Sequence, residues 1–353
     1  MINLLVVDDS ALMRKLLGKI FAAEADFTLR YARNGVEALE EIRREKPDVV
    51  TLDIHMPDMD GLTCLDKIMV EHPCPVVMFS ALTAEGAAIT LDALQRGAVD
   101  FVAKPSGAVS LEIDALSAQL IAKVRAASTA RLRGSLRLKE RVRHRIGGDF
   151  PTSWPKRSIP RSTGEGIVLV GTSTGGPPAL EALLVPLPAD FPWPIVVVQH
   201  MPESFTGPLA RRLDGLCALS VTEVQAASLL RPACVYIARG DADILISSRS
   251  EGLFAVSVAA DRDYPWHPST DRLVRSAMRE VAASQLIGIL MTGMGDDGAQ
   301  AMADLHGKGG KTIAEAEETA VVWGMPGELV KAGGADWVLP LPAIAARLQR
   351  LTP

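Results

Sequence analysis

Short apolar runs alternate with amphipathic stretches along the first 127 residues. Five runs have the length and composition of buried strands: 3–7, 28–31, 49–52, 75–79 and 99–102. Between them, apolar side chains recur at helical spacing, for instance over 11–23 and 35–44, and Asn34 and Asp60 are placed to cap helices. This alternation predicts a doubly wound, five-stranded parallel α/β sheet, and such sheets bind ligands at the carboxyl ends of their strands.

A second alternation begins at residue 166. Its predicted buried strands are 167–170, 195–198, 235–238 and 286–290, and its predicted helices are 178–184 and 268–281. The stretch 245–258 has the pattern of a β-hairpin, so we expect this second sheet to be mixed, although mostly parallel. The C-terminal part of the chain is therefore predicted to be another α/β domain.

The composition changes between the two alternating regions. Residues 128–163 carry ten Lys or Arg side chains and two acidic ones, and the later part of this stretch is rich in proline and serine. We interpret 128–164 as a linker between a domain over 1–127 and a domain over 165–353. For the basic run, the pattern favours a solvated helix over a dedicated binding site.

The overall composition is that of a globular chain. Of 353 residues, 48% are hydrophobic and 22% are charged, which is enough apolar material for well-formed cores. The basic segment carries +8, so the remainder carries −13 to give the total of −5, and this balance disfavours a nucleic-acid-coated surface. The four cysteines form no C-x-x-C pair. No signal-peptide pattern or apolar run of ~20 residues occurs, so we expect a cytoplasmic protein without membrane insertion.

Acidic side chains follow two strands that are predicted to be neighbours. Asp8 and Asp9 come just past the first strand, and Asp53 comes just past the third. In a sheet of order 2-1-3-4-5 these strand ends are adjacent, and three carboxylates there form a hard-oxygen site suited to Mg²⁺. Ser80 after the fourth strand and Lys104 after the fifth bring a hydroxyl and an ammonium to the same rim. This set has the chemistry of phosphoryl transfer to a carboxylate.

Residues 1–105 resemble the receiver domain of two-component response regulators. The resemblance implies that Asp53 is the phosphoacceptor and that it binds Mg²⁺ for phosphorylation together with Asp8 and Asp9. It also implies three switch residues at the same rim of the sheet. These are Ser80, Phe101 and Lys104.

A glycine-rich turn opens the second region. Ser173 lies in a G-x-S-x-G turn that follows a predicted strand and precedes a helix. Such a turn exposes the hydroxyl and directs backbone N–H groups and the positive helix end toward a developing oxyanion. A glycine-rich loop before a helix is also able to hold phosphate, so partner residues must decide. His200 follows the strand 195–198 and is the best placed of six histidines to act as a base, with His267 as the reserve candidate.

An acidic pair follows the strand 286–290. The glycine-rich stretch after that strand contains Asp296 and Asp297, which adds an orienting carboxylate to the same crevice. The chain order Ser, His, Asp differs from the order Ser, Asp, His of α/β-hydrolases, so that fold is not implied. Triads are recognised by their geometry rather than by their order.

Residues 166–340 resemble the catalytic domain of the chemotaxis-specific protein-glutamate methylesterases. The motifs that carry the resemblance are 171–176, 199–202 with 205–206, 292–298 and 324–326. They imply Ser173 as the nucleophile, His200 as the base and Asp297 as its partner, with Asp296 at a variable position. The backbone near Thr174 and Met294 is the implied oxyanion hole, and the esterase site needs no cofactor.

The two resemblances together imply a function. It is phosphorylation-activated hydrolysis of glutamate γ-methyl esters on methyl-accepting chemotaxis receptors, with deamidation of receptor glutamines, under a chemotaxis histidine kinase. We expect the unphosphorylated receiver to cover the esterase cleft and phosphorylation of Asp53 to relieve that block. Three positions depart from the family pattern, His267, Glu315 and Arg239, and they bear on substrate recognition more than on chemistry.

Two other functions compete with this one. Residues 293–298 match the dinucleotide-binding pattern G-x-G-x-x-G, but Asp296 and Asp297 would then face a pyrophosphate, and like charges disfavour that arrangement. The alternative from another class is a receiver-controlled interaction module without esterase activity, contacting nucleic acid through 131–161. No helix-turn-helix pattern supports it, so no nucleic-acid partner is expected.

Overall fold

A computed structural model describes residues 1–80, 83–104, 113–132 and 166–352. The chain divides into two compact units, with the division between residues 150 and 151. Apart from residues 128–132, the predicted linker over 128–164 lies outside the described residues. The linker boundaries and its basic helix therefore remain predictions.

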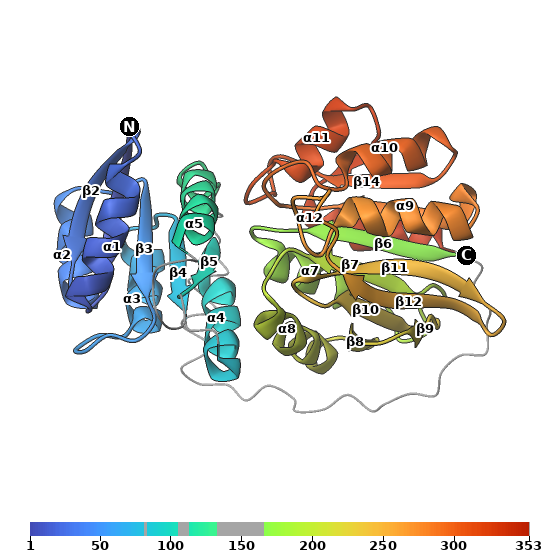
Figure 1. Ribbon diagram of the computed structural model, residues 1–353, viewed down its shortest axis with the longest axis horizontal. Helices are drawn as coiled ribbons and strands as arrows, with labels where there is room; N and C mark the ends of the chain where they lie inside the picture. Colours follow the sequence, from blue (N-terminus) through green and yellow to red (C-terminus); the bar gives the residue numbers. More distant parts are fainter. Residues whose placement is uncertain (81–82, 105–112, 133–165, 353) are drawn as a thin grey trace. The chain divides into compact units, whose positions relative to one another are not determined.

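The first unit contains a parallel five-stranded sheet in the order β2-β1-β3-β4-β5, as predicted. Its strands, seen in Figure 1, are β1 (Ile2–Val7), β2 (Phe27–Ala32), β3 (Val49–Asp53), β4 (Val76–Ser80) and β5 (Asp100–Ala103). The register pairs Val7 with Leu52 and Asp53 with Phe79, so the carboxyl ends of the central strands finish at the same level.

A helix follows each of these strands along the chain, as in a doubly wound topology. They are α1 (Ala11–Ala22), α2 (Gly35–Arg44), α3 (Gly61–Glu71), α4 (Ala84–Arg96) and α5 (Ile113–Ser128). Both predicted caps are confirmed: Asn34 Oδ1 accepts the Glu37 N–H at 2.9 Å, and Asp60 Oδ1 accepts the Thr63 N–H at 2.7 Å. The capped ends hold α2 and α3 at fixed points after their strands.

The second unit is built on a seven-stranded sheet in the order β15-β14-β13-β6-β7-β10-β8, and every pairing in it is parallel. Its strands are β6 (Ile167–Thr172), β7 (Ile195–Gln199), β8 (Ser220–Val224), β10 (Cys234–Ala238), β13 (Leu286–Leu290), β14 (Lys311–Glu315) and β15 (Trp337–Leu339). The central strand β6 lies between β7, which follows it, and β13, which comes much later in the chain. This arrangement makes the end of β6 a topological switch point, where α/β sheets bind ligands.

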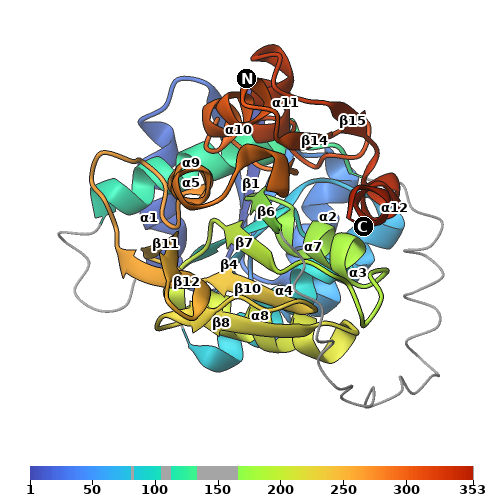
Figure 2. The same cartoon turned by 90° about the vertical axis from the view of Figure 1, so that its right-hand side faces the viewer.

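The predicted hairpin exists, but the prediction of a mixed second sheet was wrong. The hairpin strands β11 (Ala242–Arg249) and β12 (Gly252–Ala259) form a separate antiparallel sheet with β9 (Ser228–Leu229). The physical reason is that β11 packs beside α9 (Thr270–Glu280) and not at an edge of the parallel sheet; Figures 1 and 2 draw both elements. Ser276 Oγ on α9 accepts the Ile246 N–H at 2.9 Å and fixes this contact.

The remaining helices of the second unit cover its parallel sheet. They are α7 (Gly176–Leu184), α8 (Glu203–Leu216), α10 (Ala299–Gly307), α11 (Met325–Lys331) and α12 (Leu341–Leu351). The helix predicted over 268–281 begins two residues later, because Ser269 Oγ accepts the Arg272 N–H at 3.3 Å as the N-cap. Of the helices within the described ranges, none has both the length and the apolar character needed to cross a bilayer.

Candidate functional site

An acidic cluster lies at the carboxyl edge of the first sheet. Asp8 follows β1, Asp53 ends β3, and one oxygen from each of Asp8, Asp9 and Asp53 falls within 4.8 Å of the others. Asp8 and Asp53 are buried, whereas Asp9 is exposed to solvent. Clustered carboxylate oxygens beside an open edge fit Mg²⁺, which takes oxygen ligands and keeps some of its waters. The acidic triad is therefore typical of a Mg²⁺ site.

Lys104 supplies a positive charge to this cluster. Its Nζ lies 2.8 Å from Asp53 Oδ2 and 3.2 Å from Asp8 Oδ2. Burial lowers the pKa of the Lys104 ammonium, but hydrogen bonds and charge interactions with Asp53 and Asp8 outweigh burial and raise the pKa above its ordinary value. Burial raises the pKa of the Asp8 carboxyl, and Lys104 offsets that only in part. The cluster thus retains unsatisfied negative charge.

The two other predicted switch residues are also buried near this edge. Ser80 ends β4, and its hydroxyl is bonded to α4: Thr90 Oγ1 lies 2.6 Å from Ser80 Oγ, which donates to Gly86 O at 3.3 Å. The ring of Phe101 on β5 is buried, and Lys123 Nζ lies 5.0 Å from its centroid. The sequence does not reveal Thr90, because its contact with Ser80 depends on how α4 packs.

Backbone hydrogen bonds bring the candidate catalytic residues of the second unit to one edge. Ser173 follows β6 and donates its N–H to Thr292 O at 3.0 Å. His200 follows β7 and donates its N–H to Thr172 O at 3.1 Å. Asp297 lies in the loop between β13 and α10. The three predicted triad residues therefore extend from the ends of three adjacent strands.

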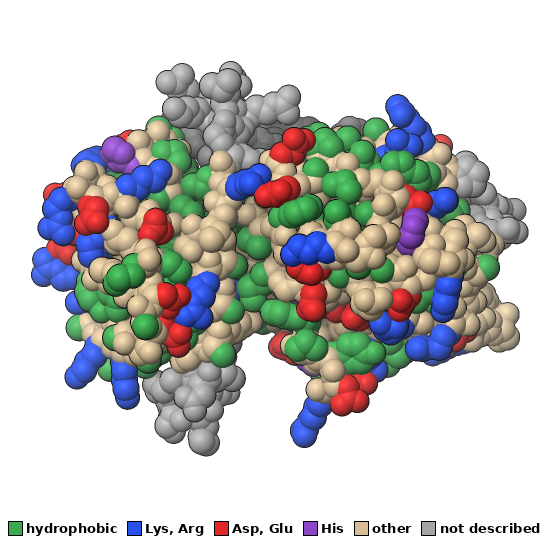
Figure 3. Space-filling view, turned by 90° about the horizontal axis from the view of Figure 1, so that it is seen from above, with side chains coloured by type: hydrophobic (Ala, Val, Ile, Leu, Met, Phe, Trp, Pro, Cys, Tyr) green, Lys and Arg blue, Asp and Glu red, His purple; other side chains and the backbone are tan. Residues whose placement is uncertain are grey.

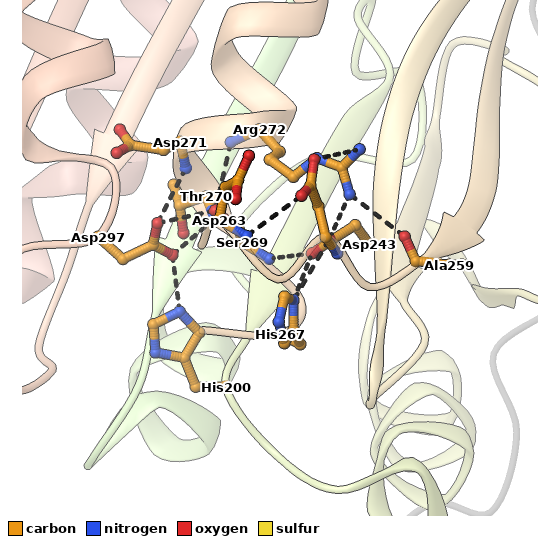
Figure 4. Close-up of polar contacts among 11 residues, drawn as sticks. His200, Asp243, Ala259, Asp263, His267, Ser269, Thr270, Asp271, Arg272 and Asp297 are labelled. Carbon is orange, nitrogen blue, oxygen red and sulfur yellow. Dashed lines mark hydrogen bonds and ion pairs between the residues drawn. The ribbon is translucent and has the colours of Figure 1, made fainter. Parts of the chain in front are cut away.

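His200 and Asp297 form a direct contact. His200 Nε2 lies 2.8 Å from Asp297 Oδ2, as Figure 4 shows. The Asp297 carboxylate also accepts the Thr270 N–H at 2.6 Å, the Ser269 hydroxyl at 3.0 Å and the Asp271 N–H at 3.1 Å. Burial raises the pKa of Asp297, but the hydrogen bonds from His200 and the backbone outweigh burial and lower it below the ordinary value. The carboxylate is therefore ionised and orients the imidazole.

The second imidazole nitrogen of His200 has a different environment. An ionised Asp297 accepts a hydrogen bond from the Nε2–H, so Nδ1 carries the lone pair. Nδ1 is buried and has no hydrogen-bond partner among the described residues. Within this part of the chain no hydrogen bond joins Ser173 Oγ to His200, although Thr172 and Gln199 pair across the two strands that carry them. Nδ1 is the free acceptor beside the serine turn.

Two glycines, Gly175 and Gly176, shape the turn at Ser173. Gly175 has φ +77°, a conformation that favours glycine. A Cβ on Gly176 would lie 1.9 Å from Gln199 Oε1, so a larger residue there would displace the buried Gln199 side chain. Gln199 Nε2 in turn donates to Ser173 O at 2.9 Å. Gln199 thus locks the serine turn, a role that its position next to His200 did not reveal.

The predicted oxyanion residues lie on two segments that Thr292 joins. A Cβ on Gly293 would lie 2.7 Å from Ser173 Cβ, so the backbone leading to Met294 packs directly against the serine. Thr292 Oγ1 donates to Thr174 O at 2.9 Å, and the Thr292 N–H donates to buried Glu315 Oε2 at 2.9 Å. Glu315, one of the three positions that depart from the family pattern, therefore holds the backbone of Thr292 in place beside the serine turn.

The other two departures contact carboxylates other than that of Asp297. His267 Nδ1 lies 3.3 Å from Asp243, so its imidazole is paired with a different carboxylate from that of His200 (Figure 4). Arg239 pairs with Glu203 at the start of α8. Because the His267 imidazole contacts Asp243 and not Asp297, the structure does not support His267 as the reserve base.

The two units together define the class of protein. Acidic residues and a lysine at the carboxyl edge of a five-stranded parallel sheet are typical of a receiver, and a serine, a histidine and a buried aspartate at adjacent strand ends are typical of a hydrolase. The profile of the response regulator receiver domain matches residues 4–114, and that of the CheB methylesterase matches residues 168–348. The chain belongs to the CheB methylesterase family and carries a receiver domain.

Two similar proteins cover nearly the whole chain. The chain is 55% identical over 354 residues to protein-glutamate methylesterase/protein-glutamine glutaminase 2 of Rhodopseudomonas palustris (strain BisB18), covering 98% of this chain and 97% of that protein. It is 50% identical over 353 residues to protein-glutamate methylesterase/protein-glutamine glutaminase 3 of Rhodospirillum rubrum, covering 99% and 95%. The crystal structure of the Thermotoga maritima CheB methylesterase catalytic domain covers 53% of this chain and 98% of its own, with 39% identity and a TM-score of 0.51.

Proposed function

We infer that this chain is a protein-glutamate methylesterase and protein-glutamine glutaminase regulated by its receiver domain. Membership of the CheB methylesterase family and similarity along the whole chain to two such enzymes support this function. The observation that carries the mechanism is the buried contact between His200 and Asp297 beside the Ser173 turn. A triad of this kind activates a serine for acyl transfer.

The proposed reaction proceeds through an acyl-enzyme. Ser173 Oγ attacks the γ-carbonyl carbon of a methylated glutamate while His200 Nδ1 takes the hydroxyl proton and Asp297 holds the imidazole. The backbone N–H groups of Thr174 and Met294 stabilise the oxyanion. The imidazolium then protonates the departing methoxide, and methanol leaves. Water, deprotonated by the same imidazole, cleaves the acyl-enzyme and restores the serine.

Glutamine side chains follow the same course. Attack on a γ-amide gives the same acyl-enzyme, with ammonia leaving in place of methanol after protonation by the imidazolium. The substrates are methyl-accepting chemotaxis receptors, on which the CheB family acts. The rest of the site needs only backbone N–H groups and the triad, so the proposed esterase reaction uses no cofactor.

The receiver supplies the control in this proposal. Asp53 takes a phosphoryl group from a chemotaxis histidine kinase and forms an acyl phosphate. Asp8, Asp9 and Asp53 would hold Mg²⁺, which supplies positive charge to the phosphoryl oxygens when bound. Lys104 offsets the new charge, and Ser80 exchanges its bonds to α4 for one to the phosphoryl group. The unphosphorylated and phosphorylated forms of the receiver then differ in packing. Phosphorylation thereby shifts the populations of the two conformations.

Domain boundaries and location belong to the same proposal. The receiver extends over 1–127, the linker over 128–164 and the methylesterase domain over 165–353. All four cysteines are free thiols, and burial raises the pKa of three of them, Cys64, Cys74 and Cys217, to about 12. Unpaired thiols are the rule in a reducing compartment, which supports a cytoplasmic location.

Methanol release from methylated receptor preparations tests the enzymatic function. Ser173→Ala should abolish the release of both methanol and ammonia, a loss on the order of 10⁶-fold in kcat, because the nucleophile is gone. Ser204→Ala is the matched control, since the buried Ser204 hydroxyl has no hydrogen-bond partner among the described residues. Persistence of either activity in Ser173→Ala would exclude this serine as the nucleophile.

An interaction module without esterase activity remains the alternative to this function. A nucleic-acid surface requires Lys and Arg side chains concentrated on one face. On the face seen in Figure 3, acidic and basic side chains are interspersed among the described residues. Salt-dependent DNA binding by the full chain, without methanol release, would favour the module.

A further inference from the structure

An aromatic ring lies flat against the candidate catalytic histidine. The ring centroids of Trp266 and His200 are 5.2 Å apart, and their planes differ by 2°. Aromatic rings at this separation and orientation are in stacking contact. Trp266 lies in the segment between β12 and α9, far along the chain from His200. The family motifs of the sequence do not include it, and no periodic pattern singles it out.

The same indole also touches the loop that carries Asp297. Gly295 has φ +81°, and a Cβ placed on it would lie 3.0 Å from Trp266 Cζ2. Gly295 therefore lets the backbone of this loop approach the indole closely. Trp266 thus contacts the imidazole of His200 directly and lies against the backbone two residues before Asp297.

The segment that carries Trp266 is fixed at both ends by one carboxylate. Asp243, which is buried at the start of β11, accepts the Asp261 N–H at 3.2 Å and the Ser269 N–H at 2.8 Å. His267, the residue next to Trp266, adds a contact of 3.3 Å to the same carboxylate. Figure 4 shows Asp243 between His267 and Arg272, whose guanidinium forms an ion pair with it. The indole is therefore presented on a braced segment.

We propose that Trp266 is a positioning residue for the inferred esterase reaction: its indole holds the His200 imidazole between Asp297 and Ser173 and favours the imidazolium that forms during proton transfer. The face of an indole carries negative charge density and attracts a cation stacked on it. In the inferred reaction His200 becomes a cation when it takes the serine proton. The contact is therefore stronger in the transition state than before it, and such contacts act on kcat rather than on KM.

This proposal also assigns a role to the departure at His267. A histidine at that position pairs with Asp243 and helps to hold the segment that carries the indole. The departure bears on the geometry of the base and not on contact with the substrate. The effect on the reaction passes through Trp266 and then through His200.

Two substitutions separate the ring face from the bulk of the side chain. Trp266→Leu keeps an apolar side chain that excludes water but has no aromatic face, and Trp266→Phe keeps a smaller face. We expect Trp266→Leu to lower kcat for methanol release roughly tenfold with KM within about twofold of wild type, and Trp266→Phe to recover most of kcat. Trp337→Leu is the control, because that indole stacks with Arg347 and should leave kcat unchanged.

A second measurement tests the role of Trp266 without using the proposed methyl-ester substrate. A fluorophosphonate probe reacts with an activated serine, releasing fluoride, and needs the nucleophile and the base but no methyl ester. Its rate of inactivation should fall in Trp266→Leu by about the same factor as kcat. Labelling of Ser173 in a wild type that releases no methanol would contradict the substrate but leave the role of Trp266 intact. Equal kcat values for the Leu and wild-type proteins, or a change in KM alone, would overturn the proposal.

Discussion

The two parallel sheets of this chain both present polar groups at the carboxyl ends of their strands, but they satisfy their carboxylates differently. In the receiver, buried Asp8 and Asp53 share one ammonium, that of Lys104, and the pKa of Asp8 is raised chiefly by burial. In the second unit, buried Asp297 accepts four hydrogen bonds, and its pKa is lowered.

The difference explains how one type of sheet edge supports two chemistries. A cluster of carboxylates with too little positive charge favours the arrival of a cation and then of a phosphoryl group. A carboxylate whose hydrogen bonds are already made instead fixes the position of a base. In the proposed function the receiver edge binds a cation and then a phosphoryl group, whereas the carboxylate of the esterase edge acts through hydrogen bonds that are already made.

Of the substitutions that test this difference between the two sheet edges, Asp297→Asn is expected to have the largest effect on kcat. The amide presents an N–H group toward His200 and no longer favours the tautomer with a free Nδ1, so kcat for methanol release should fall by roughly 10³- to 10⁴-fold. Asp296→Asn is the matched control, since its side chain is exposed and should leave kcat unchanged. Similar kcat values for the two variants would show that the buried hydrogen bonds do not orient the base.

The next effect concerns the other edge. Asp53→Ala should leave basal methanol release intact and remove its stimulation by a small acyl phosphate, a stimulation on the order of 5- to 150-fold in a coupled system. The reason is that the proposed phosphoacceptor carboxylate is absent, while the proposed triad is untouched. Stimulation that survives in Asp53→Ala would contradict the assignment of the phosphoacceptor.

Two helix-capping residues, Ser269 and Asn34, provide a matched pair of substitutions, one in each unit. Ser269 caps α9 and donates to Asp297, whereas Asn34 caps α2 and contacts no candidate catalytic residue. Replacing either residue by Ala should lower the free energy of unfolding by about 1 kcal/mol. Ser269→Ala should in addition lower kcat roughly tenfold, because the carboxylate loses a hydrogen bond. Kinetics and urea unfolding of both variants test this, and equal kcat values would refute it.

The smallest effect is a pH dependence of stability. The pKa of Asp297 is lowered from its ordinary value of 3.8 in the folded state. The carboxylate therefore stabilises the fold above that pH, and this contribution is lost as the pH falls through the folded pKa. Between pH 6 and pH 3, the free energy of unfolding should fall by about 1 kcal/mol more in wild type than in Asp297→Asn. Parallel urea titrations measure the difference, and identical losses would contradict it.

The sequence predicted the strand ends and the residues that follow them better than the surroundings of those residues. Strands such as β13 are short, apolar and bounded by turns, so their ends, and with them Asp53, Ser173 and His200, could be located from local pattern alone. The contacts of Trp266 and Asp243 could not be located in this way. They depend on the hairpin forming a separate layer beside α9, which is decided by tertiary packing.

Chelation of divalent cations tests the contrast between the two edges most directly. Methanol release by the full chain is measured with and without a small acyl phosphate, before and after addition of EDTA. We predict that EDTA abolishes the stimulation and leaves basal release unchanged, because among the described residues the acidic cluster that could hold a cation is that of Asp8, Asp9 and Asp53 in the receiver. Loss of basal release on chelation, or stimulation that persists in EDTA, would contradict the account.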